Sequence, residues 1–65
     1  MTYQYLVNGK EVSRERALEA IGNYYNIEAR EPDIAYAEAW ADYDHRHKGK
    51  PGWFINDEIE VRVIR

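Results

Sequence analysis

The first twelve residues alternate between strand-like and turn-like segments. Residues 3–7 are rich in tyrosine and branched aliphatic side chains, and a shorter run follows Asn8 and Gly9. Because Asn and Gly tolerate the positive φ angles of a tight turn, this pattern predicts a β-hairpin. Ser13 stands next, and its hydroxyl is suited to accept a hydrogen bond from the first turn of a helix. The chain therefore opens as two strands followed by a helix N-terminus.

The spacing of the apolar positions lengthens after this serine. Apolar residues recur every three or four positions over residues 14–25, which predicts a helix with one apolar face. Asn26 is the expected left-handed residue at its end. A second helix is predicted over residues 32–46, because Pro32 suits a first helical turn, where its missing N–H would be unpaired anyway. Residues 48–52 should end this helix, with their basic side chains at the negative end of the helix dipole.

The C-terminal part returns to a β pattern. Residues 53–55 are a short apolar run, and residues 58–63 alternate strictly between charged and apolar side chains. Such alternation is typical of a half-buried antiparallel strand, with Glu58, Glu60 and Arg62 on the face away from the apolar residues.

The element order is therefore β-β-α-α-β-β. We predict a single α+β domain over residues 1–65, with a small antiparallel β-sheet and two helices packed on one face. The residues expected to supply most of its core are Leu6, Leu18, Ile21, Tyr25, Ala37, Trp40, Phe54, Ile59, Val61 and Val63.

Composition sets limits on this domain. A chain of 65 residues buries only about 60% of the surface that its unfolded form exposes. It has no cysteine, so neither disulfides nor a thiolate zinc site can add stability. Its apolar runs are far shorter than the roughly 20 residues needed to cross a bilayer, and no signal-peptide pattern opens it. We expect a cytoplasmic protein.

Charge is unevenly distributed along the second predicted helix. The net charge is −3, yet residues 28–44 contain six acids and one base, and residues 45–50 contain three bases and no acid. Three interpretations are open. The acids imitate a nucleic-acid backbone and bind a basic protein groove, or they form an ordinary solvated face. In the third, the basic residues contact phosphates while Trp53 stacks on a base, although the net acidity opposes this. The basic residues of this third interpretation are Arg46, Lys48 and Lys50.

Catalytic chemistry finds little support. The only serine and threonine are Ser13, already assigned to the helix cap, and Thr2. There is no Gly-rich phosphate loop of the P-loop type. Asp44 and His47 share a helix face but lack a third metal ligand. We expect no enzyme activity, no cofactor and no metal site.

The aromatic residues are the remaining candidates. Six Tyr, two Trp and one Phe exceed what so small a core usually needs, and aromatic side chains are enriched at protein interfaces. We therefore expect a non-enzymatic protein-interaction module whose partner is another protein or a second copy of the chain. The candidate interaction residues are Tyr24, Tyr36, Glu38, Asp42, Tyr43, Asp44 and Trp53.

Residues 5–15, YLVNGKEVSRE, cover a hairpin turn and a helix cap. This first third of the chain resembles the start of short uncharacterised proteins encoded by phages and prophages of Gram-positive bacteria. The resemblance implies an accessory protein that binds and blocks a host protein, and anti-CRISPR proteins are one such class. No residue matches a defined anti-CRISPR motif, so no functional residue follows from it.

Overall fold

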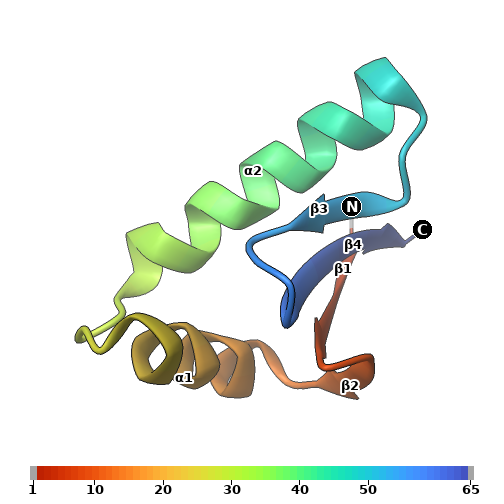
Figure 1. The fold of residues 1–65 in the computed structure, drawn as a ribbon. Coiled ribbons are helices and arrows are strands. Elements are labelled where there is room, and N and C mark those ends of the chain that lie inside the picture. The colour runs from red at the N-terminus through yellow and green to blue at the C-terminus, as the bar shows by residue number, and fades with distance from the viewer. Residues whose placement is uncertain (1, 65) are drawn as a thin grey trace.

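The computed structural model describes residues 2–64, which fold as a two-layer α+β domain (Figure 1). Its elements are β1 (Thr2–Val7), β2 (Lys10–Val12), α1 (Arg14–Tyr25), α2 (Glu31–Lys48), β3 (Gly52–Phe54) and β4 (Ile59–Ile64). The strands form one antiparallel sheet in the order β2-β1-β4-β3. The predicted fold class and element order are confirmed.

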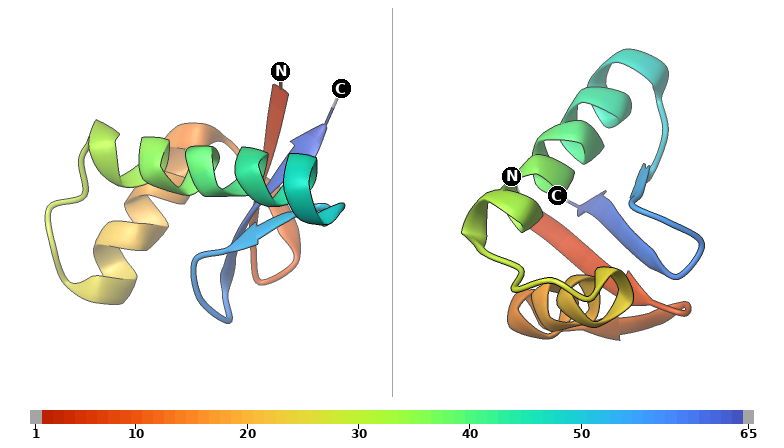
Figure 2. Two further views of the ribbon diagram at one scale, coloured as in Figure 1. Left: turned by 90° about the horizontal axis from the view of Figure 1, so that it is seen from above. Right: turned by 60° about the vertical axis from the view of Figure 1, so that its left-hand side comes forward.

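The two central strands come from opposite ends of the chain. β1 pairs with β4 over its whole length, from Thr2 opposite Ile64 to Val7 opposite Ile59. The start of the first strand and the end of the last therefore lie side by side (Figure 2). The centre of the sheet forms only when both ends of the chain have met.

Local signals place the turns and helix ends where the sequence predicts them. Asn8 and Gly9 have φ angles of 53° and 81° in the hairpin turn. The Ser13 hydroxyl accepts a hydrogen bond from the Arg16 N–H at 3.1 Å, and Asn26 ends α1 with a φ of 56°. α1 has the predicted bounds. α2 begins one residue earlier and ends two residues later than predicted.

The core lies between the sheet and the two helices. Its buried apolar residues are Tyr5, Ala17, Ile21, Ile34, Ala37, Ala41, Ile59 and Val61.

Three residues predicted for the core are exposed instead: Tyr25, Trp40 and Phe54. Phe54 is exposed because its neighbour Trp53 takes the helix-facing position on β3, and successive side chains of a strand point to opposite faces. Trp40 is exposed because small alanines form the row of α2 that meets the sheet. Leu6, Leu18 and Val63, also predicted core residues, are only half-buried.

One charged residue is unexpectedly buried on the face of the sheet away from the helices. Glu60 lies on this face, as predicted, but it is a buried residue. Its neighbours across the strands are Leu6 and Phe54, and the Arg62 guanidinium contacts its carboxylate at 3.0 Å. Burial of this acid is tolerated because a cation is paired with it.

Within residues 2–64, no helix combines the length and the apolar character required to cross a membrane.

Candidate interaction surface

α2 carries three different sets of side chains around its axis. The row that faces the sheet is Ile34, Ala37, Ala41 and Asp44, all of them buried. Because 3.6 residues make one helical turn, residues three or four positions apart lie on the same side. One flank of α2 turns acidic residues toward β1, and the other turns aromatic residues toward β3.

The flank toward β3 forms a continuous aromatic surface, which we define as Tyr36, Trp40, Tyr43 and His47 of α2 together with Trp53 of β3. Trp40 and Trp53 stack with ring centroids 6.2 Å apart and planes at 26°. Tyr36 meets Trp53 edge to face at 6.0 Å, and Tyr43 meets Trp40 in the same way at 5.6 Å. His47 follows at 4.4 Å from Tyr43. Each ring therefore restricts the orientation of its neighbours.

These rings remain accessible to solvent. The exposed fractions are 61% for Tyr36, 48% for Tyr43 and 39% for Trp40. Exposed aromatic rings held in fixed positions lose little conformational entropy when a partner covers them. The surface therefore has the properties of a preformed binding site.

The side of α2 that faces solvent adds to this surface. Ala35 and Ala39 are both exposed, and a shallow groove of about 270 Å³ runs over Tyr36, Ala39, Trp40 and Tyr43. A surface helix normally carries charged and polar residues on its outer side. Here that side is apolar over two turns, so α2 has apolar residues on both its inner and its outer sides.

A second apolar groove begins beside Tyr36. Its volume is about 310 Å³, and it lies between the C-terminal part of α1, the start of α2 and the turn after β3. Tyr25 lines this groove, and its hydroxyl accepts a hydrogen bond from Asn56 at 3.2 Å. Asp33 is the charged residue in its lining. The grooves extend the accessible apolar area on both sides of Tyr36.

The acidic flank of α2 is tied into the domain by Arg14. The Arg14 guanidinium donates to Glu38 at 2.7 and 3.2 Å and to Glu31 at 2.9 Å, while the Tyr5 hydroxyl also donates to Glu38. Hydrogen bonding from Arg14 lowers the pKa of Glu38, although burial opposes this. Burial, reinforced by the hydrogen bond to Glu38, raises the pKa of Tyr5 to about 12. This network joins β1, α1 and α2.

The other acids of α2 also have partners within the domain. Asp33 accepts the Arg30 backbone N–H at 2.7 Å and so caps the helix. Asp42 pairs with Arg46 at 3.0 Å. Asp44 is buried, with the Lys48 ammonium 3.8 Å away, and one of its carboxylate oxygens has no hydrogen-bond partner within residues 2–64. Over the same residues, no group of three His, Cys, Asp or Glu side chains is placed to hold a metal ion.

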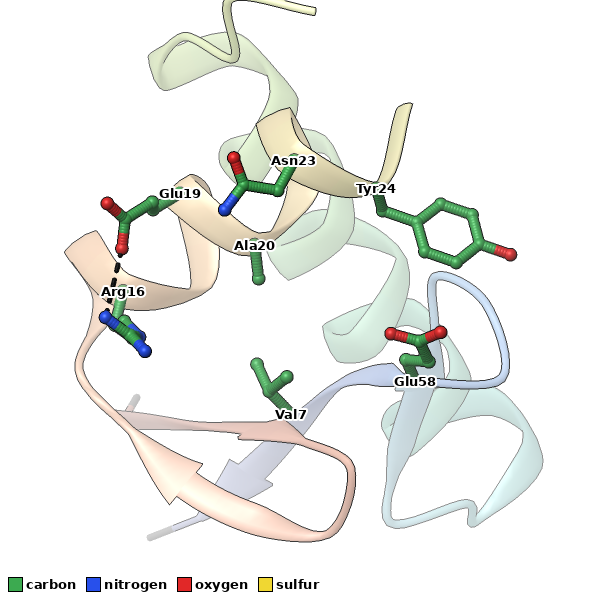
Figure 3. A pocket seen from close by; sticks show the side chains of 7 residues that line it. All are labelled: Val7, Arg16, Glu19, Ala20, Asn23, Tyr24 and Glu58. Atoms are coloured by element: carbon green, nitrogen blue, oxygen red, sulfur yellow. Dashed lines mark hydrogen bonds and ion pairs between the residues drawn. The ribbon is translucent and has the colours of Figure 1, made fainter. Parts of the chain in front are cut away.

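Tyr24 lies apart from the other candidates. It belongs to α1, stacks edge to face on Tyr25 at 4.8 Å, and borders an open, mostly polar pocket of about 500 Å³ (Figure 3). Val7 points from β1 toward α1 in this pocket, and Arg16 pairs with Glu19 on its rim at 3.2 Å. Its charged side chains are all on the rim and exposed, and none is fixed by burial.

The structure therefore brings together Tyr36, Tyr43 and Trp53 among the predicted interaction residues. It places Glu38 and Asp42 on the opposite flank of α2 and Asp44 beneath the helix. Sequence reasoning missed the exposed alanines, although the sequence shows Ala35 four residues before Ala39, and Ala39 four residues before Tyr43. Comparisons with protein-family models, curated proteins and solved structures found no match for this chain.

Proposed function

We propose that this protein is a non-enzymatic interaction module that binds another polypeptide through its aromatic surface. The observation that carries the proposal is the set of three large rings that α2 leaves exposed and locked against one another. Tyr and Trp are enriched among the residues that dominate binding energy at protein interfaces. The neighbouring apolar grooves offer space for side chains of the partner.

The acidic residues give less support to a function. The nucleic-acid-mimic alternative requires acids that are free to meet a basic groove, but those of α2 have partners within the domain. The nucleic-acid-binding alternative uses Arg46, Lys48 and Lys50, and two of these three, Arg46 and Lys48, are paired with Asp42 and Asp44. Both alternatives stay predictions, and the aromatic surface is the stronger basis for a proposal.

The cellular setting that we propose is the cytoplasm of a Gram-positive bacterium. The cysteine-free composition suits a reducing compartment, and the resemblance of residues 5–15 to phage and prophage proteins favours an accessory protein that acts on a host component. An extract of such a bacterium is therefore the appropriate source in which to seek a partner.

The test compares three forms of the tagged protein. The double variant Tyr36→Ser/Tyr43→Ser removes two exposed rings from the surface, whereas Tyr24→Ser removes a ring of matched exposure, 49% against 48% for Tyr43, from outside it. Proteins captured from the extract are quantified by mass spectrometry, and far-UV circular dichroism checks that each form is folded. We expect the double variant to lose a partner at least about tenfold while Tyr24→Ser keeps it. Equal capture by all three forms would contradict the proposal.

A further inference from the structure

We propose that the polypeptide bound at the aromatic surface is a second copy of this chain. In this dimer the two α2 helices pack antiparallel about a two-fold axis that passes close to Ala39. The inference rests on the proposed function, because it names the partner at the same surface. Three features of α2 lead to it: its shape, its distribution of charge and the area that it exposes.

The shape of the outer side of α2 is self-complementary. Ala39 is next to the midpoint of the helix, which runs from Glu31 to Lys48, and it lies in the shallow groove between the two tyrosines. A two-fold axis at this residue sets Tyr43 of one copy opposite Ala35 of the other, because each is four residues from the axis. A large ring then meets a small exposed side chain, and the same contact repeats on the far side of the axis.

Charge along the helix matches the same arrangement. The first turn of α2 contains Glu31 and Asp33, and the last turn contains His45, Arg46, His47 and Lys48. An antiparallel pair sets the acidic first turn of each copy beside the basic last turn of the other. The two helix dipoles then point in opposite directions, which is the favourable arrangement for neighbouring helices. Glu31 and Arg46 are paired within the domain with Arg14 and Asp42, but their side chains are 65% and 63% exposed, so each can add a contact to the second copy. The two-fold axis therefore places opposite charges together at both ends of the paired helices.

The exposed area fits a reversible dimer. At roughly 150–250 Å² for a fully exposed aromatic side chain, the observed exposures leave roughly 300 Å² on the three rings of each copy. Two copies together supply roughly 600 Å² from these rings, which is about half of the ~1,200 Å² at the lower end of specific interfaces. The two alanines, Pro32 and His47 add to this area. We therefore expect dissociation in a range of about 1–100 µM.

Cysteine cross-linking tests the register directly, because the chain has no cysteine of its own. Helices in contact have axes about 8–10 Å apart, and Cα atoms lie about 2.3 Å from the axis. The two Cα atoms of residue 39 are then roughly 3.4–5.4 Å apart, which overlaps the range of disulfides. Ala39→Cys should cross-link to itself under mild oxidation. Asn23→Cys, at an exposed position of α1, should not.

A second position distinguishes antiparallel from parallel packing. In the antiparallel dimer the two copies of residue 35 are about 12 Å apart along the helix axis, so Ala35→Cys should not cross-link to itself. A mixture of Ala35→Cys with Tyr43→Cys should form the mixed disulfide. If Ala35→Cys cross-links to itself as readily as Ala39→Cys, the proposed arrangement is overturned.

Sedimentation equilibrium from about 5 to 500 µM separates this inference from the proposed function. We expect the unmodified chain to form dimers and Ala39→Arg to weaken them at least tenfold with an unchanged circular dichroism spectrum. Asn23→Arg adds the same charge to α1 and should leave the dimer intact. A chain that stays monomeric throughout, yet captures a different protein that Tyr36→Ser/Tyr43→Ser loses, refutes the second copy and leaves the proposed function standing.

Discussion

The link between Arg14 and Glu38 gives the most informative test of how this small domain is held together. α1 and α2 share few direct contacts, and Arg14 at the start of α1 binds two carboxylates of α2. We consider Arg14→Met, which keeps the aliphatic part of the side chain and removes the charge with its hydrogen-bond donors. Within residues 2–64, the Glu38 carboxylate then keeps only the Tyr5 hydroxyl as a hydrogen-bond partner.

Burial sets the expected loss of stability. The side chain of Glu38 is 15% exposed and that of Arg14 38%. Leaving one partner of a fully buried ion pair unmatched costs about 3–5 kcal/mol, whereas exposed pairs contribute about 0.2–1 kcal/mol. The Glu38 pair lies between these limits, so we expect Arg14→Met to lower the free energy of unfolding by about 2 kcal/mol. A domain of this size has a total of roughly 3–10 kcal/mol.

Glu31 provides a matched control on the same guanidinium. It also accepts from Arg14, but its side chain is 65% exposed, so solvent screens the pair and Glu31→Gln should lower the free energy of unfolding far less than Arg14→Met. Urea unfolding followed by the fluorescence of Trp40 and Trp53 measures each free energy. A double-mutant cycle of Arg14→Met with Glu38→Gln isolates the pair, with a coupling energy of about 1–2 kcal/mol expected. Equal losses for Arg14→Met and Glu31→Gln would refute the argument from burial.

Two further predictions concern backbone packing and titration. A Cβ on Gly52 would lie 2.1 Å from the Val61 carbonyl oxygen, so Gly52→Ala should separate β3 from β4 and cost more than about 3 kcal/mol. Gly49→Ala, at a φ of 67° with open space around it, should cost only about 1 kcal/mol, and similar thermal denaturation midpoints for the two would show that the close approach is unimportant. Because the pKa of Glu38 is lowered, its contribution is present above pH about 4.5 and is lost as the pH falls through the lowered value. The pKa of Tyr5 is raised from 10.0 to about 12, so its contribution is present below pH 10 and is lost as the pH rises to about 12. Burial also raises the pKa of Tyr3, so Tyr5→Phe should reduce the alkaline loss in a series of urea titrations without abolishing it, and an unchanged alkaline slope would contradict this assignment.

The sequence by itself determined the features that depend on a few neighbouring residues. The turn at Asn8 and Gly9, the cap at Ser13 and the end of α1 at Asn26 all lie where local chemistry predicts them. Each depends on a backbone angle or a hydrogen bond within about four positions along the chain, so no distant contact is needed to specify it. The alternation of residues 58–63 likewise fixed which side of β4 faces the helices, with Ile59 and Val61 in the core.

Only the tertiary structure decided which side of α2 meets the sheet. Apolar residues occur on every side of this helix except its acidic flank, so their spacing does not distinguish the inner row from the outer one. The sheet packs against the small side chains of Ala37 and Ala41, because a row of alanines lets a helix approach closely. Trp40 was predicted for the core and is displaced to the flank.

The candidate site depends on the same choice. Tyr36, Tyr43 and Trp53 were identified as interaction residues from their number and kind, but β3 must lie beside α2 before the Trp53 ring can meet those of Tyr36 and Trp40. The acids of α2 acquire their partners in the fold as well, since Glu38 meets Arg14 and Tyr5 from two other elements. Local chemistry thus determined the elements, whereas the packing of α2 decided which aromatic rings are exposed together and which charges are already paired.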